Sequence, residues 1–356
     1  MSSRWFALAS SLGAIVGALL VGGLFLEARG MDALLAYRIL LERSVLSADG
    51  LTETAKMMAP LLIVSAGLLV ALKAGVWNIG VDGQFLVGAM AAGVVGAELT
   101  DVLPRAAMLG VAGIAGTIAG VAWALPPAIL RARFGLNEII TTLMMTYVAY
   151  NVTAWLVKGP FKDPERVAPE TPQIPRDLRL PAIPGLEVHV GVLGGLLLVA
   201  VVAALFRSTV PGFMLDMMGR NRRAALHAGI PVGALTIGAL LASGATAGLA
   251  GANDVLGVQG VFKANWDPGY GFTAFALVYL ARLHPLAIVP FTAFFALLLV
   301  GGAAMPRRAG VPTAYIDLLE GAMLLFFAAA TIAERRWRQR AESRAAESAG
   351  PAEEVA

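Results

Sequence analysis

The chain has 356 residues, of which 58% are hydrophobic and 14% are charged, and its formal net charge is +3. Soluble domains carry about a quarter charged residues, so this composition excludes an ordinary soluble protein and predicts a membrane protein. The lack of cysteine excludes disulfides and thiolate chemistry. We expect the basic balance to come from cytoplasmic loops and not from nucleic-acid binding.

Apolar runs near the roughly 20 residues that cross a bilayer recur along the chain. The first is longer than the core of a signal peptide, so we interpret it as a spanning helix. The predicted fold is an all-α, polytopic membrane helix bundle that could consist of two related halves. We place ten spans, at residues 5–26, 57–73, 80–99, 105–130, 137–157, 189–206, 232–252, 270–283, 285–304 and 313–333. Only "ARLHP" separates the eighth span from the ninth, so these two could instead form one broken helix.

The basic residues predict the orientation, because short cytoplasmic loops carry an excess of lysine and arginine. Arginines cluster after the fourth span, after the sixth span and in the C-terminal tail, so we place these three regions and both termini in the cytoplasm; Arg307 and Arg308 count against this assignment. We therefore predict a transmembrane domain over 1–333 and a cytoplasmic, partly disordered tail over 334–356. A proline-rich external loop is expected at 158–188.

A first polar island interrupts the apolar pattern in "WNIGVDGQF". Asn78, Asp82 and Gln84 lie here, next to glycines that permit a break in the helix. A charge at the centre of a bilayer costs at least about 2.5–3.5 kcal/mol, so these residues are predicted to line a path for a polar solute. The alternative is that Asn78 and Asp82 cap the helix that follows.

A second island begins the fifth span, in "GLNEIITTLMMTYVAYN". Asn137, Glu138, Thr142 and Asn151 are candidates for the same path. Acidic residues also favour helix N-termini for electrostatic reasons, which would explain Glu138 without a transport role. The GxxxG pairs Gly116/Gly120 and Gly244/Gly248 predict close helix packing.

A third island, "GRNRRAALHAGIP", lies in the predicted cytoplasmic segment 207–231. Its alanines favour a short helix, which glycine and proline then terminate. This helix could dock a cytoplasmic partner, or the segment could serve only to set orientation. The candidate docking residues are Arg220, Asn221, Arg222, Arg223, Ala224, Ala225 and Gly229.

Several motifs are absent from the sequence. There is no GxxxxGK[ST] loop, so the chain is not expected to hydrolyse nucleotide itself. No HExxH or GxSxG motif occurs, which argues against an enzyme. The three histidines, His189, His227 and His284, are far apart, so no metal site is predicted.

These motifs, together with "SGATAGLAGANDVLG" and "GYGFTAFALVYLARLHP", occur in an order that resembles one known family. It comprises the permease subunits of bacterial ABC importers for simple sugars and nucleosides, within the group of ribose and branched-chain amino-acid permeases. The resemblance covers about 51–325, and the "NIGxxGQ" form points to the nucleoside-type branch. It departs at Asp216, where the family usually has arginine, and at Arg222, which often is proline.

The resemblance implies a multi-pass protein of the bacterial inner membrane with several partners. These are a cytoplasmic ABC ATPase, a second permease subunit that is expected to be a different homologous chain, and an extracytoplasmic substrate-binding protein. The chain itself would need no cofactor, since the partner uses the ATP. The resemblance assigns the 220–229 helix to ATPase coupling. The alternative function is a secondary transporter driven by an ion gradient, with Asp82 and Glu138 as its coupling acids.

Overall fold

The computed structural model describes residues 3–348, with side chains described for 12–333 and 336. Within this range the protein is all-α, and its only β pairing consists of two isolated bridges, Glu170–Lys263 and Ala182–His189. The chain forms two compact units. One contains residues 1–39 and 302–356, and the other contains residues 40–301.

The smaller unit is built around two long helices. α1 (Ser3–Ala28) packs against α14 (Tyr315–Ser348), with α13 (Met305–Ala309) before it. The Tyr37 hydroxyl on α2 (Ala33–Ser44) lies 2.8 Å from the Tyr315 hydroxyl and ties the two ends of the chain together. α14 continues past position 333, so the tail predicted over 334–356 starts within this helix. Residues 349–356 of the tail lie outside the described part of the chain.

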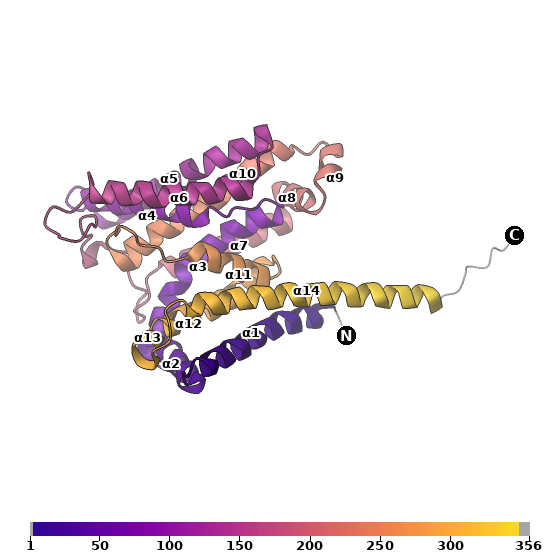
Figure 1. Cartoon of the computed structure of the whole chain (residues 1–356). Coiled ribbons are helices and arrows are strands. Elements are labelled where there is room, and N and C mark those ends of the chain that lie inside the picture. Colours follow the sequence, from indigo (N-terminus) through magenta and orange to yellow (C-terminus); the bar gives the residue numbers. More distant parts are fainter. Residues whose placement is uncertain (1–2, 349–356) are drawn as a thin grey trace. The chain divides into compact units, whose positions relative to one another are not determined.

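The larger unit carries the helices that matter for function (Figure 1). They are α3 (Ala48–Lys73), α4 (Val81–Glu98), α5 (Arg105–Phe134), α6 (Glu138–Lys158), α7 (Gly191–Ser208), α8 (Val210–Arg220), α9 (Arg222–His227), α10 (Val232–Asp254), α11 (Tyr270–Leu280) and α12 (Ile288–Gly302). Single turns occur at Arg176–Leu178, Val255–Gln259 and Pro285–Ala287, and the second of these is a π-helix that prolongs α10.

Seven helical segments of the described residues are long and apolar enough to cross a membrane. They are Ala48–Lys73, Arg105–Phe134, Glu138–Lys158, Gly191–Ser208, Val232–Gln259, Pro285–Gly302 and Tyr315–Ala333. Leu12–Ala28 and Tyr270–Leu280 are apolar but shorter. The predicted helix bundle is therefore confirmed, and the total of ten spans stays a prediction.

α10 is the centre of the larger unit and packs against α3, α4 and α5. Its glycines make this possible: a Cβ on Gly120 would lie 2.8 Å from the Gly248 Cα, and one on Gly244 would lie 2.8 Å from the Gly120 carbonyl oxygen. Small residues let helix backbones approach closely where lipid provides no hydrophobic drive. The predicted meaning of the GxxxG pairs is confirmed.

The same contacts show that α5 and α10 run antiparallel. Gly116 faces Ala252 near the end of α10, whereas Gly120 and Ala124 face Gly244 nearer its start. The arginines that end α5 therefore lie at the same end of the bundle as the α8–α9 segment that precedes α10. The loop after α6 lies at the opposite end (Figure 1). Two of the three basic regions thus share one side, as predicted.

The proline-rich loop, residues 159–190, is folded onto the segment that follows α10. Thr171 N–H donates to the Phe262 carbonyl at 3.0 Å, and Ile174 N–H donates to the Gly260 carbonyl at 2.9 Å. The Arg179 guanidinium donates from Nη1 to the Val258 carbonyl at 3.1 Å, and burial lowers its pKa. These bonds satisfy backbone groups on both segments, so the loop covers one end of the bundle.

The region predicted as the eighth span differs from expectation. The 11-residue α11 measures only about 16 Å, roughly half the hydrocarbon thickness, so it cannot cross the membrane by itself. Residues 260–269 before it are not helical. After it, Arg282 and Leu283 have positive φ angles of 52° and 56°, which separates α11 from α12. The two segments are not one broken helix, and the prediction of 270–283 as a full span is wrong.

Candidate functional site

The turn between α3 and α4 places a group of polar side chains inside the bundle. Asn78 Nδ2 donates to Gln84 Oε1 at 2.8 Å and to Ser243 Oγ at 2.9 Å, and Gln84 Nε2 returns a bond to Asn78 Oδ1 at 3.2 Å. Asn78 and Ser243 are at most 1% exposed, as is Gln84. A buried amide costs stability unless it is hydrogen-bonded, and here the two amides satisfy each other. Ser243 of α10 is a member that the sequence analysis missed.

α6 completes this group from the other side. The buried Thr142 hydroxyl accepts the Ile79 N–H at 3.1 Å and donates to the Glu138 carbonyl at 2.6 Å. Gly80 allows the approach, because a Cβ there would lie 2.7 Å from the Thr142 carbonyl oxygen. We call Asn78, Gln84, Thr142 and Ser243 the amide cluster. The structure thus brings three of the predicted path residues together, from the α3–α4 turn, α4 and α6, in a closed arrangement.

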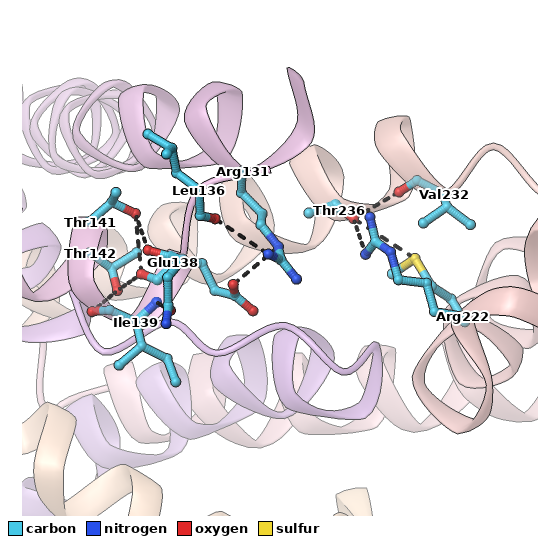
Figure 2. Close-up of polar contacts among 11 residues, drawn as sticks. Arg131, Leu136, Glu138, Ile139, Thr141, Thr142, Arg222, Val232 and Thr236 are labelled. Carbon is cyan, nitrogen blue, oxygen red and sulfur yellow. Dashed lines mark hydrogen bonds and ion pairs between the residues drawn. The ribbon is translucent and has the colours of Figure 1, made fainter. Parts of the chain in front are cut away.

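Glu138 forms an ion pair at the edge of this cluster. Figure 2 shows Arg131 at the end of α5 pointing to Glu138, and the Arg131 Nε to Glu138 Oε2 distance is 3.1 Å. The carboxylate is 8% exposed. Asn137 accepts the Ile139 N–H at 2.9 Å and is the N-cap of α6. The capping of α6 therefore accounts for the polar side chain of Asn137. The charge of Glu138 is balanced by Arg131.

Asp82 bonds to a different helix from the one predicted. Its Oδ1 accepts the Gly271 N–H at 2.6 Å, at the start of α11. The N-cap residue of α4 is Gly80, which makes no side-chain cap bond. The interpretation that Asp82 caps the helix that follows it is wrong, because the carboxylate fixes the start of α11 across the bundle. Asn151 lies apart from all of these residues: it is exposed on α6, where its amide donates to the Tyr147 carbonyl at 2.8 Å.

The predicted short basic helix is present as α9. Asn221 caps it by accepting the N–H groups of Arg223 and Ala224 at 3.1 and 3.0 Å. Gly229, with φ of 74°, ends it in a left-handed conformation that favours glycine. Ala225 is buried while Leu226 is 56% exposed, and the arginines around them are exposed. The helix therefore presents a basic and partly apolar surface at one end of the bundle.

The sequence analysis missed α8, which precedes α9. Thr209 begins it by accepting the Gly212 N–H at 3.2 Å, with a proline at its first turn. The Thr-Val-Pro sequence is a start signal that would have predicted it. Asp216, where the family usually has arginine, pairs with Arg220 at 2.8 Å and lies 3.9 Å from the Lys73 ammonium. α8 is thereby held against the end of α3.

α8 also contacts the turn that carries the amide cluster. Gly219 packs against the Lys73 carbonyl so closely that a Cβ at this position would clash with it. A Cβ on Gly75 would lie 3.1 Å from the Gly219 Cα. Three residues after Gly75 comes Asn78. The basic segment is thus in direct contact with the backbone that positions the buried polar side chains.

A further buried polar residue lies at the end of the folded loop. His189, two residues before α7, is 4% exposed, and its Nδ1 accepts the Gly191 N–H at 3.2 Å. Burial, with a smaller effect of Lys56, lowers the pKa of His189 to about 4. This side chain is therefore neutral at physiological pH. Among the described residues no group of three or more histidines and carboxylates is arranged to hold a metal ion.

Comparisons with known proteins identify a family and several relatives of this chain. A family model described as "Branched-chain amino acid transport system / permease component" matches residues 50–328. The glucose ABC transporter permease TsgB13 of Haloferax volcanii is 33% identical over 90% of this chain and 87% of its own length. The guanosine ABC transporter permease NupP of Bacillus subtilis is 31% identical over 78% and 80%. The nucleoside ABC transporter permease NupB of Lactococcus lactis is 26% identical over 90% of both chains.

Proposed function

The chain belongs to the family of permease components of branched-chain amino acid transport systems, and we propose that it carries neutral nucleosides or simple sugars inward. As a member of this family, it is a multi-pass membrane protein and a permease subunit of an ABC transporter. Relatives named for glucose, guanosine and nucleosides support this choice of solute.

The observation that supports an energy-coupled role is the contact of α8 with the end of α3 and with Gly75, in the turn that carries Asn78. α9 presents exposed arginines and Leu226 at one end of the bundle, the surface that a cytoplasmic ATPase would contact. α8 continues from it and packs through Gly219 on Lys73 and Gly75. A displacement of α8–α9 is expected to move the α3–α4 turn with it, because no side chain separates the two backbones.

The proposed mechanism is alternating access. ATP binding and hydrolysis occur in a separate ATPase subunit, which pushes on α8–α9 and shifts α4 and α6 relative to each other. The amide cluster then opens, and Asn78, Gln84 and Thr142 exchange bonds with one another for bonds with a passing hydroxyl-bearing solute. Asp82, Asn137, Glu138 and Asn151 retain their proposed places near this path. A second permease subunit, a different homologous chain, completes the path, and an extracytoplasmic binding protein delivers the solute.

The test is reconstitution with the partner subunits encoded beside this chain. Proteoliposomes holding the whole importer and its binding protein are expected to accumulate radiolabelled guanosine, uridine or glucose only with internal ATP. A matched complex whose ATPase subunit binds but does not hydrolyse ATP should show no uptake. Uptake that continues without ATP, and stops when ion gradients are dissipated, would support the secondary-transporter alternative instead.

A further inference from the structure

The segment before α11 descends to the middle of the bundle. Tyr150 is the thirteenth of the 21 residues of α6, which places it near the middle of a helix that is long enough to span. A Cβ on Gly83, next to Asp82, would lie 2.7 Å from the Thr146 Cα, so Asp82 lies beside the middle of α6. Tyr150 interacts electrostatically with Asp267, on the non-helical stretch that leads to α11. α11 therefore begins near mid-depth, where Asp82 accepts the Gly271 N–H. Non-helical backbone at such depth is tolerated only where protein or a water-filled path covers it.

A group of packed aromatic rings includes Trp266, the residue directly before Asp267. The ring centroids of Trp266 and the buried Phe85 are 5.7 Å apart, and those of Trp266 and the buried Phe262 are 5.8 Å apart. The Tyr270 ring meets Phe85 edge-on at 5.3 Å. Trp266 is only half-buried, so the inner rings fix its position while part of its surface stays free.

Two carboxylates of this region have acceptor capacity left over. Asp267 Oδ1 accepts the Gly269 N–H at 3.0 Å, and the residue is exposed although it lies beside the mid-helix residue Tyr150. An ionisable residue at this depth faces a polar path or a partner and not lipid, because exposure to hydrocarbon is costly. Behind the rings, Asp254 is 2% exposed, acts electrostatically on Tyr270, and leaves its Oδ2 without a hydrogen-bond donor. The region therefore offers unused acceptors and an open aromatic face.

We infer that Trp266, Asp267 and Tyr150 form a mid-membrane contact site for a neutral, hydroxyl-bearing ring, such as a nucleoside or a simple sugar. The indole face stacks on the ring, and the Asp267 carboxylate accepts hydrogen bonds from its hydroxyl groups. The negative charge excludes phosphorylated forms of the same compounds. This inference rests on the proposed function, and it adds a site on α6 and the α10–α11 segment that is separate from the amide cluster.

The lack of native cysteine makes the test direct. Asp267→Cys gives a chain with a single thiol, and Val148→Cys, at the middle of α6 and 46% exposed, is the control for a lipid-facing position. Each variant is assembled into the full importer and treated with a membrane-impermeant thiosulfonate. We expect the Asp267→Cys thiol to react, and guanosine, uridine or glucose at millimolar concentration to slow the reaction at least about fivefold. The thiol of the Val148→Cys control should not react.

Transport by milder variants gives a second measurement. We expect Asp267→Asn and Trp266→Ala to raise the KM for uptake at least tenfold, with the ATPase rate unchanged. Asp101→Asn, an exposed acid in the α4–α5 turn, and Trp155→Phe are matched controls that should leave KM unaltered. Thiols that do not react, or that react without protection, overturn the inference, as does an unchanged KM. Failure of the wild-type importer to take up any of these solutes with ATP would instead overturn the proposed function.

Discussion

Two polar regions of the larger unit differ in how their hydrogen bonds are completed. The amide cluster is fully buried, and its amides bond to each other and to Ser243. The group around Trp266 keeps an exposed carboxylate, a half-exposed indole and an unpaired acceptor on Asp254. In a membrane, a closed network stabilises one conformation, whereas an open group needs a partner that the chain alone does not supply. The first region is therefore expected to control stability and motion, and the second to control affinity.

The largest expected effect is a loss of folding stability when the amide cluster is altered, compared with the same kind of change in the group around Trp266. Asn78→Leu leaves Gln84 and Ser243 buried without their partner, at about 1–3 kcal/mol for each unsatisfied group. We expect a marked fall in the thermal midpoint of the detergent-solubilised protein, and little change for Asp267→Asn. Thermal unfolding followed by tryptophan fluorescence measures both. Equal midpoints for the two variants would contradict the comparison.

The next effect concerns the contact between α8 and the α3–α4 turn. Gly219→Ala places a methyl group against the Lys73 carbonyl, so α8 must shift away from the turn. We expect uptake per ATP hydrolysed to fall at least tenfold while ATPase activity and complex assembly persist. Gly233→Ala on α10, where a Cβ meets nothing within 4 Å, is the control. A normal transport-to-hydrolysis ratio in Gly219→Ala would exclude this route of coupling.

A smaller effect is expected for the ion pair beside the amide cluster. Glu138→Gln leaves Arg131, which is 27% exposed, without its counter-charge, and we expect a loss of about 1–2 kcal/mol after allowance for solvent screening. The Arg131→Gln/Glu138→Gln double variant should recover part of this stability. Chemical unfolding in detergent would measure the coupling in a double-mutant cycle. Strictly additive losses would show that the two residues do not interact.

The smallest effect is the pH dependence that His189 causes. The folded-state pKa of His189, about 4, lies below the ordinary value near 6.5. Above pH 6.5 the residue is neutral in both the folded and the unfolded chain, so the stability that its neutral form provides is fully present. It is lost as pH falls from 6.5 towards 4, because the unfolded chain binds a proton that the folded chain does not. Between pH 7.5 and 5.5 we expect a loss of about 1 kcal/mol that His189→Gln abolishes. His227→Gln, an exposed histidine, is the control and should leave the pH dependence as it is.

The sequence by itself determined the membrane class, most of the spans, and the short basic helix with its glycine stop. These features depend on local properties: hydrophobic length, helix capping and the conformational freedom of Gly229. It also identified Asn78, Gln84 and Thr142 as unusual, because polar residues in apolar segments are conspicuous without any knowledge of their neighbours.

Only the tertiary structure decided what those residues do in the folded chain. Asp82 fixes the start of α11, 189 positions away, and Ser243 joins Asn78 over a separation of 165. No local pattern encodes such pairings, since they depend on how closely the glycines of α4, α5 and α10 let the helices approach. For the same reason the sequence did not predict that α11 is only about half as long as a membrane span, or that the proline-rich loop folds onto residues 255–264. Burial and partner choice are properties of the packed bundle, and composition constrains them without specifying them.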